Sequence, residues 1–384
     1  MSLTSSRAGT LPVSVAQKLQ RVHWPVVILL CVIAGIGLAQ LYSVGDGAFA
    51  PWAERHALRF LLSLGLVLWV AVMPRIFWFR AAYPAYGAAL VLLALVPIMG
   101  IEAGGAQRWL ALAEIRFQPA EFMKITLVLA LARYYQGLPT KRISRPEGLI
   151  VPLVLIALPV MLTLKQPDLG TAVLFAAIGT GLMFLAGVNI FYFLASGAGA
   201  VAALPVIWAN LQDYQRRRIE VFLNPDADPL GAGYHITQSK IALGAGGFSG
   251  KGYMQGTQSQ LDFLPEKHTD FIFTTFGEEW GFAGGMVLLG LFGLLVMMLL
   301  LMSLRCASQF ARLTIAGSAL TIFVYVFINV AMVSGLVPVV GVPLPLVSYG
   351  GTSMLTVMFG IGLAMCAYVH RGRGFRRGDY GRLW

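Results

Sequence analysis

Long apolar runs recur along the whole chain, and short polar segments separate them. Each run is about as long as the roughly 20 residues that a helix needs to cross the hydrocarbon core of a bilayer. The pattern predicts ten membrane-spanning helices, over residues 24–43, 57–73, 81–100, 119–134, 149–164, 171–188, 190–210, 271–302, 313–335 and 351–369. The predicted fold class is therefore an all-α integral membrane protein.

Two parts of this pattern are less regular than the rest. The range 119–134 carries Glu121 and Lys124 inside its apolar run, and only a Gly-Val-Asn tripeptide separates the sixth and seventh ranges. We expect a helical hairpin over 171–210, with one bent segment as the alternative.

The composition agrees with a membrane protein. Hydrophobic residues make up 58% of the 384 residues, charged residues make up 12%, and the mean hydropathy is +0.75. A soluble domain of this length would need far more polar surface to cover itself.

Basic residues mark one side of the predicted membrane domain. Lys and Arg in short loops are retained on the cytoplasmic side. With the N-terminus inside, the predicted cytoplasmic segments hold Arg7, Lys18, Arg21, Arg75, Arg80, Arg133, Lys141, Arg142, Arg145, Arg305, Arg312, Arg371, Arg373, Arg376, Arg377 and Arg382. We therefore expect a cytoplasmic N-terminal tail over 1–23, a transmembrane domain over 24–369 and a basic cytoplasmic tail over 370–384.

The same asymmetry explains the formal net charge of +11. Most of the surplus follows from membrane topology and from contact with anionic lipid of the inner leaflet. We therefore exclude nucleic acid as a partner.

One outer loop, residues 211–270, is far longer than the usual connection between packed helices. Its residues 216–220 suit a surface helix, residues 224–233 are of types that favour turns, and residues 234–243 suit an amphipathic helix at the membrane interface. The glycine-rich stretch 244–252 is predicted to be a mobile hinge. It does not form a Walker motif, because Ala245 and Gly252 stand where that motif needs Gly and Ser or Thr.

Polar side chains recur near the outer ends of the predicted spans. They stand in "GGAQRWL", "FQPAEFMK", "LKQPDLGTA", "FLPEKHTDFIF" and "VPLPLVSYGGTS". The residues concerned are Arg108, Glu121, Lys124, Lys165, Asp168, Asp270 and Ser348. Together they predict a polar cavity that opens outward, in which carboxylates accept a proton or hold a divalent cation and the cations bind phosphate. A lipid-linked diphosphate would use all of these groups.

Each acidic residue also has a purely structural interpretation. Glu121 and Lys124 are three residues apart on one helical face, where they can neutralise each other. Asp168 can cap the helix that begins near residue 171, and Asp270 can cap the helix that begins at residue 271. No His or Cys cluster has the spacing of a structural zinc site.

Several long motifs in one order resemble a known family. "GAGYHITQSKIALGAGGFSGKG", "GTQSQLDFLPEKHTDFIFTTFGEEWGF", "FQPAEFMK", "QPDLGTA" and "PLPLVSYGGTS" are similar to the shape, elongation, division and sporulation family, whose members include RodA and FtsW. The wording of "GTQSQLDFLPE" and "GYHITQSK" resembles RodA more than FtsW. The similarity covers nearly the whole chain.

The resemblance implies a peptidoglycan glycosyltransferase that polymerises lipid II at the outer face of the cytoplasmic membrane during cell elongation. It assigns the essential carboxylate to Asp270, and it matches Glu121, Lys124, Asp168 and Ser348 to positions that line the family's central cavity. It also implies a class B penicillin-binding protein, a transpeptidase, as partner within the elongation machinery. For docking of that partner, the spans 190–210 and 271–302 are candidates because they flank the large loop.

Inversion at the anomeric carbon requires a base on the face opposite the leaving group, and Asp270 is our candidate. We also expect Mg²⁺ or Mn²⁺ to assist departure of the diphosphate. Two other functions stay open at this point. A lipid II flippase would also place charges within the membrane, and a non-catalytic scaffold would explain the spans alone.

Overall fold

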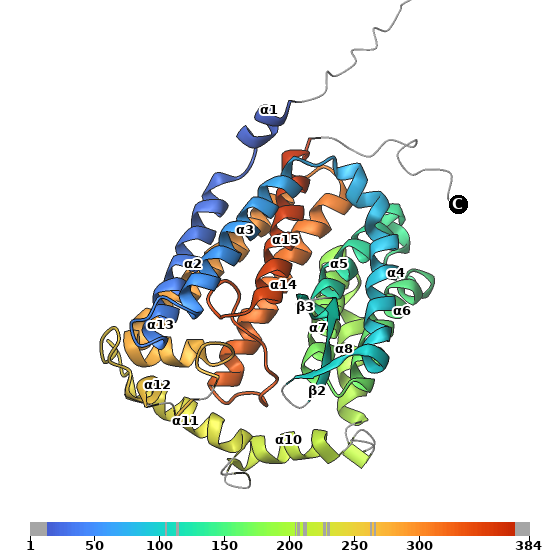
Figure 1. Cartoon of the computed structure of the whole chain (residues 1–384). Helices are drawn as coiled ribbons and strands as arrows, with labels where there is room; N and C mark the ends of the chain where they lie inside the picture. Colours follow the sequence, from blue (N-terminus) through green and yellow to red (C-terminus); the bar gives the residue numbers. More distant parts are fainter. Residues whose placement is uncertain are drawn as a thin grey trace, which may run out of the picture.

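The computed structural model describes residues 14–103, 106–112, 115–203, 205, 208–209, 213–225, 228, 231–261, 263–264 and 266–372. Within these ranges the chain is a bundle of long helices (Figure 1). The first helix, α1 (Val15–Gln20), and the end of the last, α15 (Gly351–Val369), lie at the same end of the bundle, and we call this the terminal end. The helices of the large loop and the strand β2 lie at the opposite end, which we call the loop end.

Each of the ten predicted spans coincides with a helix. The remaining helices of the bundle are α2 (Trp24–Val44), α3 (Trp52–Val72), α4 (Arg75–Met99), α5 (Pro119–Gly137), α6 (Pro146–Lys165), α7 (Leu169–Ala186), α8 (Ile190–Ala202), α13 (Ile272–Leu304) and α14 (Gln309–Val333). Within the described part of the chain, α15 and seven of the helices just listed, eight in all, are long and apolar enough to cross a membrane, and α5 and α8 are outside that group. The chain is therefore a multi-pass helical membrane protein.

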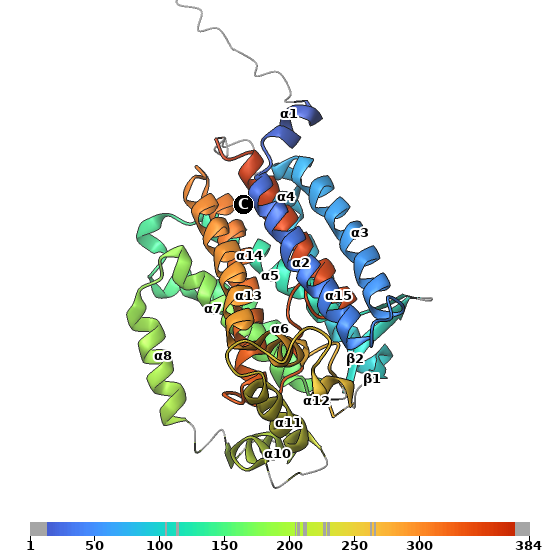
Figure 2. The same cartoon turned by 90° about the vertical axis from the view of Figure 1, so that its left-hand side faces the viewer.

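The helical hairpin predicted over 171–210 is confirmed. Gly187, in a left-handed conformation with φ of 101°, ends α7, and the Asn189 side chain accepts a hydrogen bond from the Phe191 backbone N–H at the start of α8. None of the α8 side chains is buried, and the helix stands apart from the bundle (Figure 2). Several residues of the predicted range beyond Ala202 lie outside the described residues.

Helix α5 lies inside the bundle, which explains why a segment with charged residues is stable there. It packs against α4, α6, α7, α14 and α15, and most of its side chains are buried. A charged side chain within a membrane protein is stable when it faces the interior and finds a partner there.

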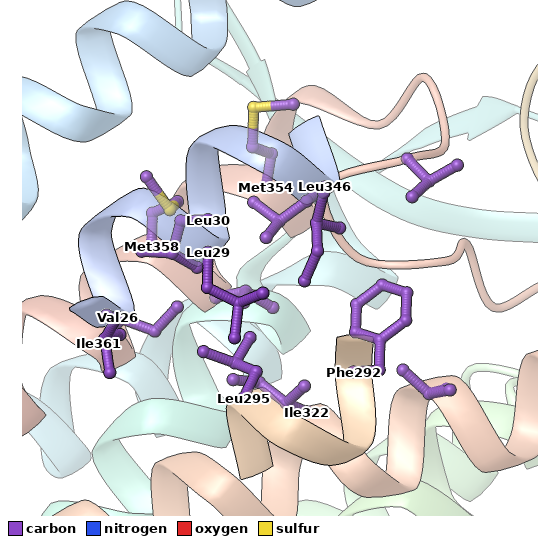
Figure 3. Packing of buried hydrophobic residues seen from close by; sticks show 14 of the residues in the cluster. Val26, Leu29, Leu30, Phe292, Leu295, Ile322, Leu346, Met354, Met358 and Ile361 are labelled. Atoms are coloured by element: carbon purple, nitrogen blue, oxygen red, sulfur yellow. The ribbon is translucent and has the colours of Figure 1, made fainter. Parts of the chain in front are cut away.

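Apolar side chains from four helices fill the part of the core beside α2 (Figure 3). They come from α2, α13, α14, α15 and the loop before α15, and include Val26, Leu29, Leu30, Phe292, Leu295, Ile322, Leu346, Met354, Met358 and Ile361. Gly37 lets α2 approach that loop, because a Cβ there would stand 2.6 Å from the Val347 Cα.

A small antiparallel sheet precedes α5 and was not predicted. Its strands are β1 (Ile101–Ala103), β2 (Ala106–Leu112) and β3 (Ile115–Phe117), in the order β1-β2-β3. The all-α prediction holds for the bundle, whereas this sheet sits at the loop end (Figure 1). Strands β1 and β3 have only three residues each, and the sequence of β2, AQRWLAL, lacks the strict alternation that marks a strand.

The large loop contains three helices, α10 (Asp213–Leu223), α11 (Ala232–Ala245) and α12 (Thr257–Gln260). Helix α10 confirms the predicted surface helix. Helix α11 confirms that residues 234–243 are helical. It corrects the predicted location at the membrane interface, because one face of the helix packs against α13 and α14. The Ser239 hydroxyl, fully buried, donates to the Val333 carbonyl at 2.7 Å and lies 2.7 Å from the Thr274 hydroxyl.

The prediction of a mobile glycine hinge is wrong. The backbone of 247–252 pairs with α13 where Gly281, at φ of 68°, breaks that helix. Lys251 and Gly252 donate to the carbonyls of Glu278 and Glu279 at 3.0 Å, and two N–H groups of α13 donate back to residues 247 and 248. A Cβ at Gly250 would overlap the Glu279 carbonyl, so the glycines serve close backbone contact.

Candidate active site

Asp270 lies two residues before the start of α13 and does not cap it. The N-cap position belongs to Phe271, and no side chain makes a capping hydrogen bond there. Among the described residues, the Asp270 carboxylate accepts no hydrogen bond, whereas its backbone carbonyl accepts one from Asn329 Nδ2 at 2.8 Å. The structural alternative for Asp270, helix capping, is therefore wrong.

The protonation of Asp270 is tuned by its surroundings. Burial raises the pKa of this carboxyl to about 7, the Glu266 carboxylate adds to the rise, and the Arg108 guanidinium opposes it. A general base works best when its pKa lies near the operating pH. Asp270 thus has the acid–base properties that a proton acceptor needs at neutral pH.

The loop 334–350 connects Asp270 to the start of α7. A Cβ on Gly341 would stand 3.3 Å from Asp270 Oδ2, and a Cβ on Gly170 would stand 2.8 Å from Val340. Asn329 Nδ2 also donates to the Val342 carbonyl at 2.7 Å. These contacts hold the Asp270 segment, the loop and the N-terminus of α7 together at the loop end.

Asp168 caps α7 as the sequence predicts, and it also holds Arg108. Its carboxylate accepts from the Thr171 N–H at 3.2 Å and from the Thr171 hydroxyl at 2.7 Å. Arg108 Nε lies 3.5 Å from Asp168 Oδ2, and Arg108 Nη2 donates to the Pro167 carbonyl at 3.2 Å. The Arg108 side chain keeps 20% of its surface exposed, so the guanidinium is oriented but still accessible.

Glu121 and Lys124 neutralise each other, and Tyr325 completes a buried triad with them. Lys124 Nζ lies 2.7 Å from Glu121 Oε1 and donates to the Tyr325 hydroxyl at 2.5 Å, and that hydroxyl donates to Glu121 Oε2 at 2.5 Å. Lys124 is only 1% exposed and Tyr325 is fully buried. The ammonium group of Lys124 therefore faces protein partners.

Ser348 and Lys165, the other two predicted site residues, differ in accessibility. Ser348 is 2% exposed, and its hydroxyl oxygen accepts a hydrogen bond from the Leu344 N–H at 2.7 Å, which braces the loop 334–350. Lys165, at the end of α6, is exposed and has no hydrogen bond or ion pair within the described part of the chain. Of these two, only Lys165 presents its polar group to a ligand.

An aromatic cluster fixes the residues just before Asp270. The rings of Trp52 and His268 stack at 4.1 Å, and the Tyr349 N–H donates to the His268 carbonyl at 2.8 Å. The Arg59 guanidinium lies 4.5 Å from the centre of the Tyr349 ring. Burial lowers the pKa of His268, so the stacked ring is neutral at pH 7.

The sequence interpretation missed Tyr325 and Asn329, which support the two groups of candidate residues. Both stand on α14, four residues apart and on one helical face. Their signal was present, because a polar side chain inside a predicted span is a candidate functional residue.

The described residues contain no group of three or more His, Cys, Asp or Glu that could hold a metal ion. Mg²⁺ in phosphate chemistry needs fewer protein ligands, because one or two carboxylates and the substrate phosphates hold it. The exposed carboxylate of Glu266, which lies near Asp270, fits such a shared site and leaves Asp270 free to accept a proton.

The fold and these residues define a multi-pass membrane protein with a proton acceptor and an oriented cation at one end of its bundle. The chain belongs to the FtsW/RodA/SpoVE family of cell cycle proteins, whose profile matches residues 18–372. It is 45% identical over 314 residues to peptidoglycan glycosyltransferase MrdB of Escherichia coli, which covers 81% of this chain and 84% of that protein. It is 39% identical over 288 residues to MrdB of Helicobacter pylori, with 73% and 74% covered.

Solved structures of similar proteins support the same family assignment. A structure described as "Structural coordination of polymerization and crosslinking by a peptidoglycan synthase complex" matches with a TM-score of 0.79 and 33% identity, over 91% of this chain and 98% of that one. The rod shape determining protein RodA of Thermus thermophilus matches with a TM-score of 0.69 and 31% identity, over 92% and 98%.

Proposed function

We propose that this chain is a peptidoglycan glycosyltransferase that polymerises lipid II into β-1,4 glycan strands at the outer face of the cytoplasmic membrane during cell elongation. The relatives named above carry that activity in their names, and this chain matches them over most of its length. The observation that carries the proposal for the site is the Asp270 carboxylate, which has a pKa near 7 and lies within the electrostatic reach of Arg108.

In the proposed reaction, Asp270 accepts the proton of a sugar 4-hydroxyl. The hydroxyl oxygen then bonds to the anomeric carbon of the second substrate, and the bond from that carbon to the diphosphate oxygen breaks. The diphosphate leaves with the electron pair, and the configuration inverts from α to β. Positioned base catalysis of this kind typically contributes about 10²–10⁴-fold in rate.

In this proposal the diphosphate binds at Arg108 and Lys165, because Lys165 is exposed and the Arg108 side chain keeps 20% of its surface exposed. The Asp168 carboxylate orients the Arg108 guanidinium, as a supporting side chain commonly does for a residue that contacts the substrate. The buried triad Glu121–Lys124–Tyr325 and the hydroxyl of Ser348 hold the walls around them. A divalent cation such as Mg²⁺ or Mn²⁺, when bound, would supply further charge neutralisation to the diphosphate.

The proposed orientation places the loop end outside the cell and both termini in the cytoplasm, as the distribution of Lys and Arg predicts. Alkaline phosphatase folds to an active form only outside the cytoplasm. A fusion at Gly250 is therefore expected to be active and a fusion after Arg142 inactive. The reverse pattern would place the site on the wrong side for this substrate.

The proposed partner is a class B penicillin-binding protein, a transpeptidase of the elongation machinery. A matched structure comes from a peptidoglycan synthase complex that coordinates polymerisation with crosslinking, which supports such a partner here. Of the two spans predicted to dock it, α13 borders an apolar groove of about 480 Å³ with α14, lined by Phe292, Gly293, Phe323 and Phe327. Apolar walls beside a small residue suit close packing of a helix within a membrane.

The test of the function uses the purified, reconstituted chain with fluorescent lipid II, with and without the transpeptidase, and detects glycan polymer on a gel. Polymer that depends on this chain supports the proposal. Movement of lipid II between leaflets without polymer would favour the flippase, and neither activity would favour the scaffold.

A further inference from the structure

One cavity at the terminal end lies far from the proposed active site. It has a volume of about 510 Å³, within the usual range for ligand sites. It lies where the C-terminal ends of α5, α7 and α13 meet the N-terminal end of α14.

The lining of this cavity divides into a polar part and an apolar part. The polar part includes Tyr135, Thr140, Ser303, Gln309 and Arg312. The apolar part includes Leu185, Leu300 and Leu304, which are exposed at 41%, 37% and 67%. A lining of this kind suits an amphiphile whose headgroup meets the polar part and whose acyl chain follows the leucines.

The hydroxyl of Tyr135 is buried beside this cavity without a hydrogen-bond partner among the described residues. This residue is 1% exposed. A buried hydroxyl without a partner destabilises a fold, so such a group calls for a ligand or water as its partner.

Arg312 supplies the charge. Its side chain is exposed, and within the described part of the chain its guanidinium has no carboxylate or hydrogen-bond partner. The cavity lining contains no Asp or Glu. A phosphate would therefore meet a cation and several neutral donors, whereas the ammonium of a zwitterionic headgroup would find no anion.

We propose that this cavity binds an anionic glycerophospholipid of the surrounding membrane, with its phosphate at Arg312 and Tyr135 and one acyl chain along Leu300 and Leu304. This site is separate from the polymerisation site. It does not depend on the proposed catalytic function, because none of its residues belongs to that machinery.

The test is lipid binding to the purified full chain in a neutral detergent, measured by native mass spectrometry with dioleoylphosphatidylglycerol as probe. We expect Arg312→Gln to bind this lipid roughly tenfold more weakly, because a charge-assisted hydrogen bond is lost. Arg305→Gln is the matched control, because Arg305 is also exposed at this end of the bundle but does not line the cavity.

Tyr135→Phe gives a second readout that does not require a charge change. Without added lipid we expect its melting temperature to equal or exceed that of the wild type, because the hydroxyl has no protein partner. With phosphatidylglycerol, the variant should gain less thermal stability than the wild type.

Three lipid-binding results would overturn the proposal. These are equal phosphatidylglycerol binding by wild type and Arg312→Gln, an equal loss in Arg305→Gln, and equally tight binding of dioleoylphosphatidylcholine. Displacement of the lipid by inorganic phosphate alone would also overturn it, since the site would then select free phosphate.

Discussion

The side-chain amide of Asn329 donates to the backbone carbonyl of Asp270 at 2.8 Å and to that of Val342 at 2.7 Å. Asn329 is fully buried on α14, one turn beyond Tyr325, which binds both Glu121 and Lys124. One face of α14 therefore supports both the proposed base and the buried ion pair.

Asn329→Ala should slow polymerisation by more than about tenfold, because it leaves the Asp270 segment without its tether. It should also cost about 1–3 kcal/mol for each buried carbonyl left without a partner. Initial rates over a range of lipid II concentrations, together with thermal unfolding, measure both effects. We expect kcat to fall by a larger factor than the factor by which KM changes. The matched control is Ser318→Ala on the same helix. The Ser318 hydroxyl donates to the Gly360 carbonyl and makes no hydrogen bond to the Asp270 segment. Equal rate losses in both variants would contradict a positioning role for Asn329.

Asp270→Asn should give a stable, membrane-inserted protein that makes no detectable glycan. The carboxylate makes no hydrogen bond within the described residues and does not cap α13, so its replacement by an amide removes no stabilising contact. An amide is a very poor base, and we expect a loss of about 10²–10⁴-fold or more. Gel detection of polymer and a melting curve of the purified variant provide the measurement. Near-normal polymerisation would show that Asp270 is not the base.

The polymerisation rate should rise with pH through about 7 and then level off, because the active form of Asp270 is the carboxylate and its pKa is about 7. Glu266→Gln removes a charge that raises this pKa, so the profile should move to lower pH. Arg108→Gln removes the opposing charge and should move the profile to higher pH, with weaker substrate binding as well. Rate profiles of the three proteins test this, and identical midpoints would refute the electrostatic account.

The same pKa fixes the sign of a stability effect. Because folding raises the pKa of Asp270 from 3.8, the folded state holds its proton more tightly than the unfolded state. This contribution to stability is present below about pH 4 and is lost as the pH rises through about 7. The wild type should therefore lose stability relative to Asp270→Asn between pH 4 and pH 8. The difference in free energy of unfolding, variant minus wild type, should be larger at pH 8 than at pH 4.

Gly250→Ala should destabilise the protein, because φ is 81° there and the new Cβ would overlap the Glu279 carbonyl. Strain of this kind costs about 1–3 kcal/mol. Gly244→Ala is the control: it lies in α11 with open space around its Cβ position, and it should stabilise the helix by about 0.5–1 kcal/mol. Melting temperatures that move the same way in both variants would contradict the close backbone contact at α13.

Polymerisation should fall when divalent cations are removed. A diphosphate leaving group in a site that also holds the carboxylates of Asp270 and Glu266 meets repulsion that Mg²⁺ or Mn²⁺ would relieve. The rate in excess EDTA, before and after Mg²⁺ is restored, measures this dependence. Undiminished polymerisation in EDTA would show that Arg108 and Lys165 suffice.

The sequence by itself determined the helical bundle. Lipid cannot satisfy backbone N–H and C=O groups, so a long apolar run has little alternative to a helix, and all ten predicted ranges contain one. The cap at Asp168 was also readable, because its partner Thr171 is three residues away. Local interactions of this kind depend on neighbours that the sequence places within one turn.

The tertiary structure alone decided how the polar residues are used. Asp270 stands free of its helix, although its position suggested a cap, and Lys124 is enclosed by Tyr325, which is 201 residues away in the chain. The glycines of 246–252 pair with a break in α13 that no local pattern marks. Each of these outcomes depends on which helix packs beside which, and packing contacts join residues whose separation in sequence carries no periodic signal.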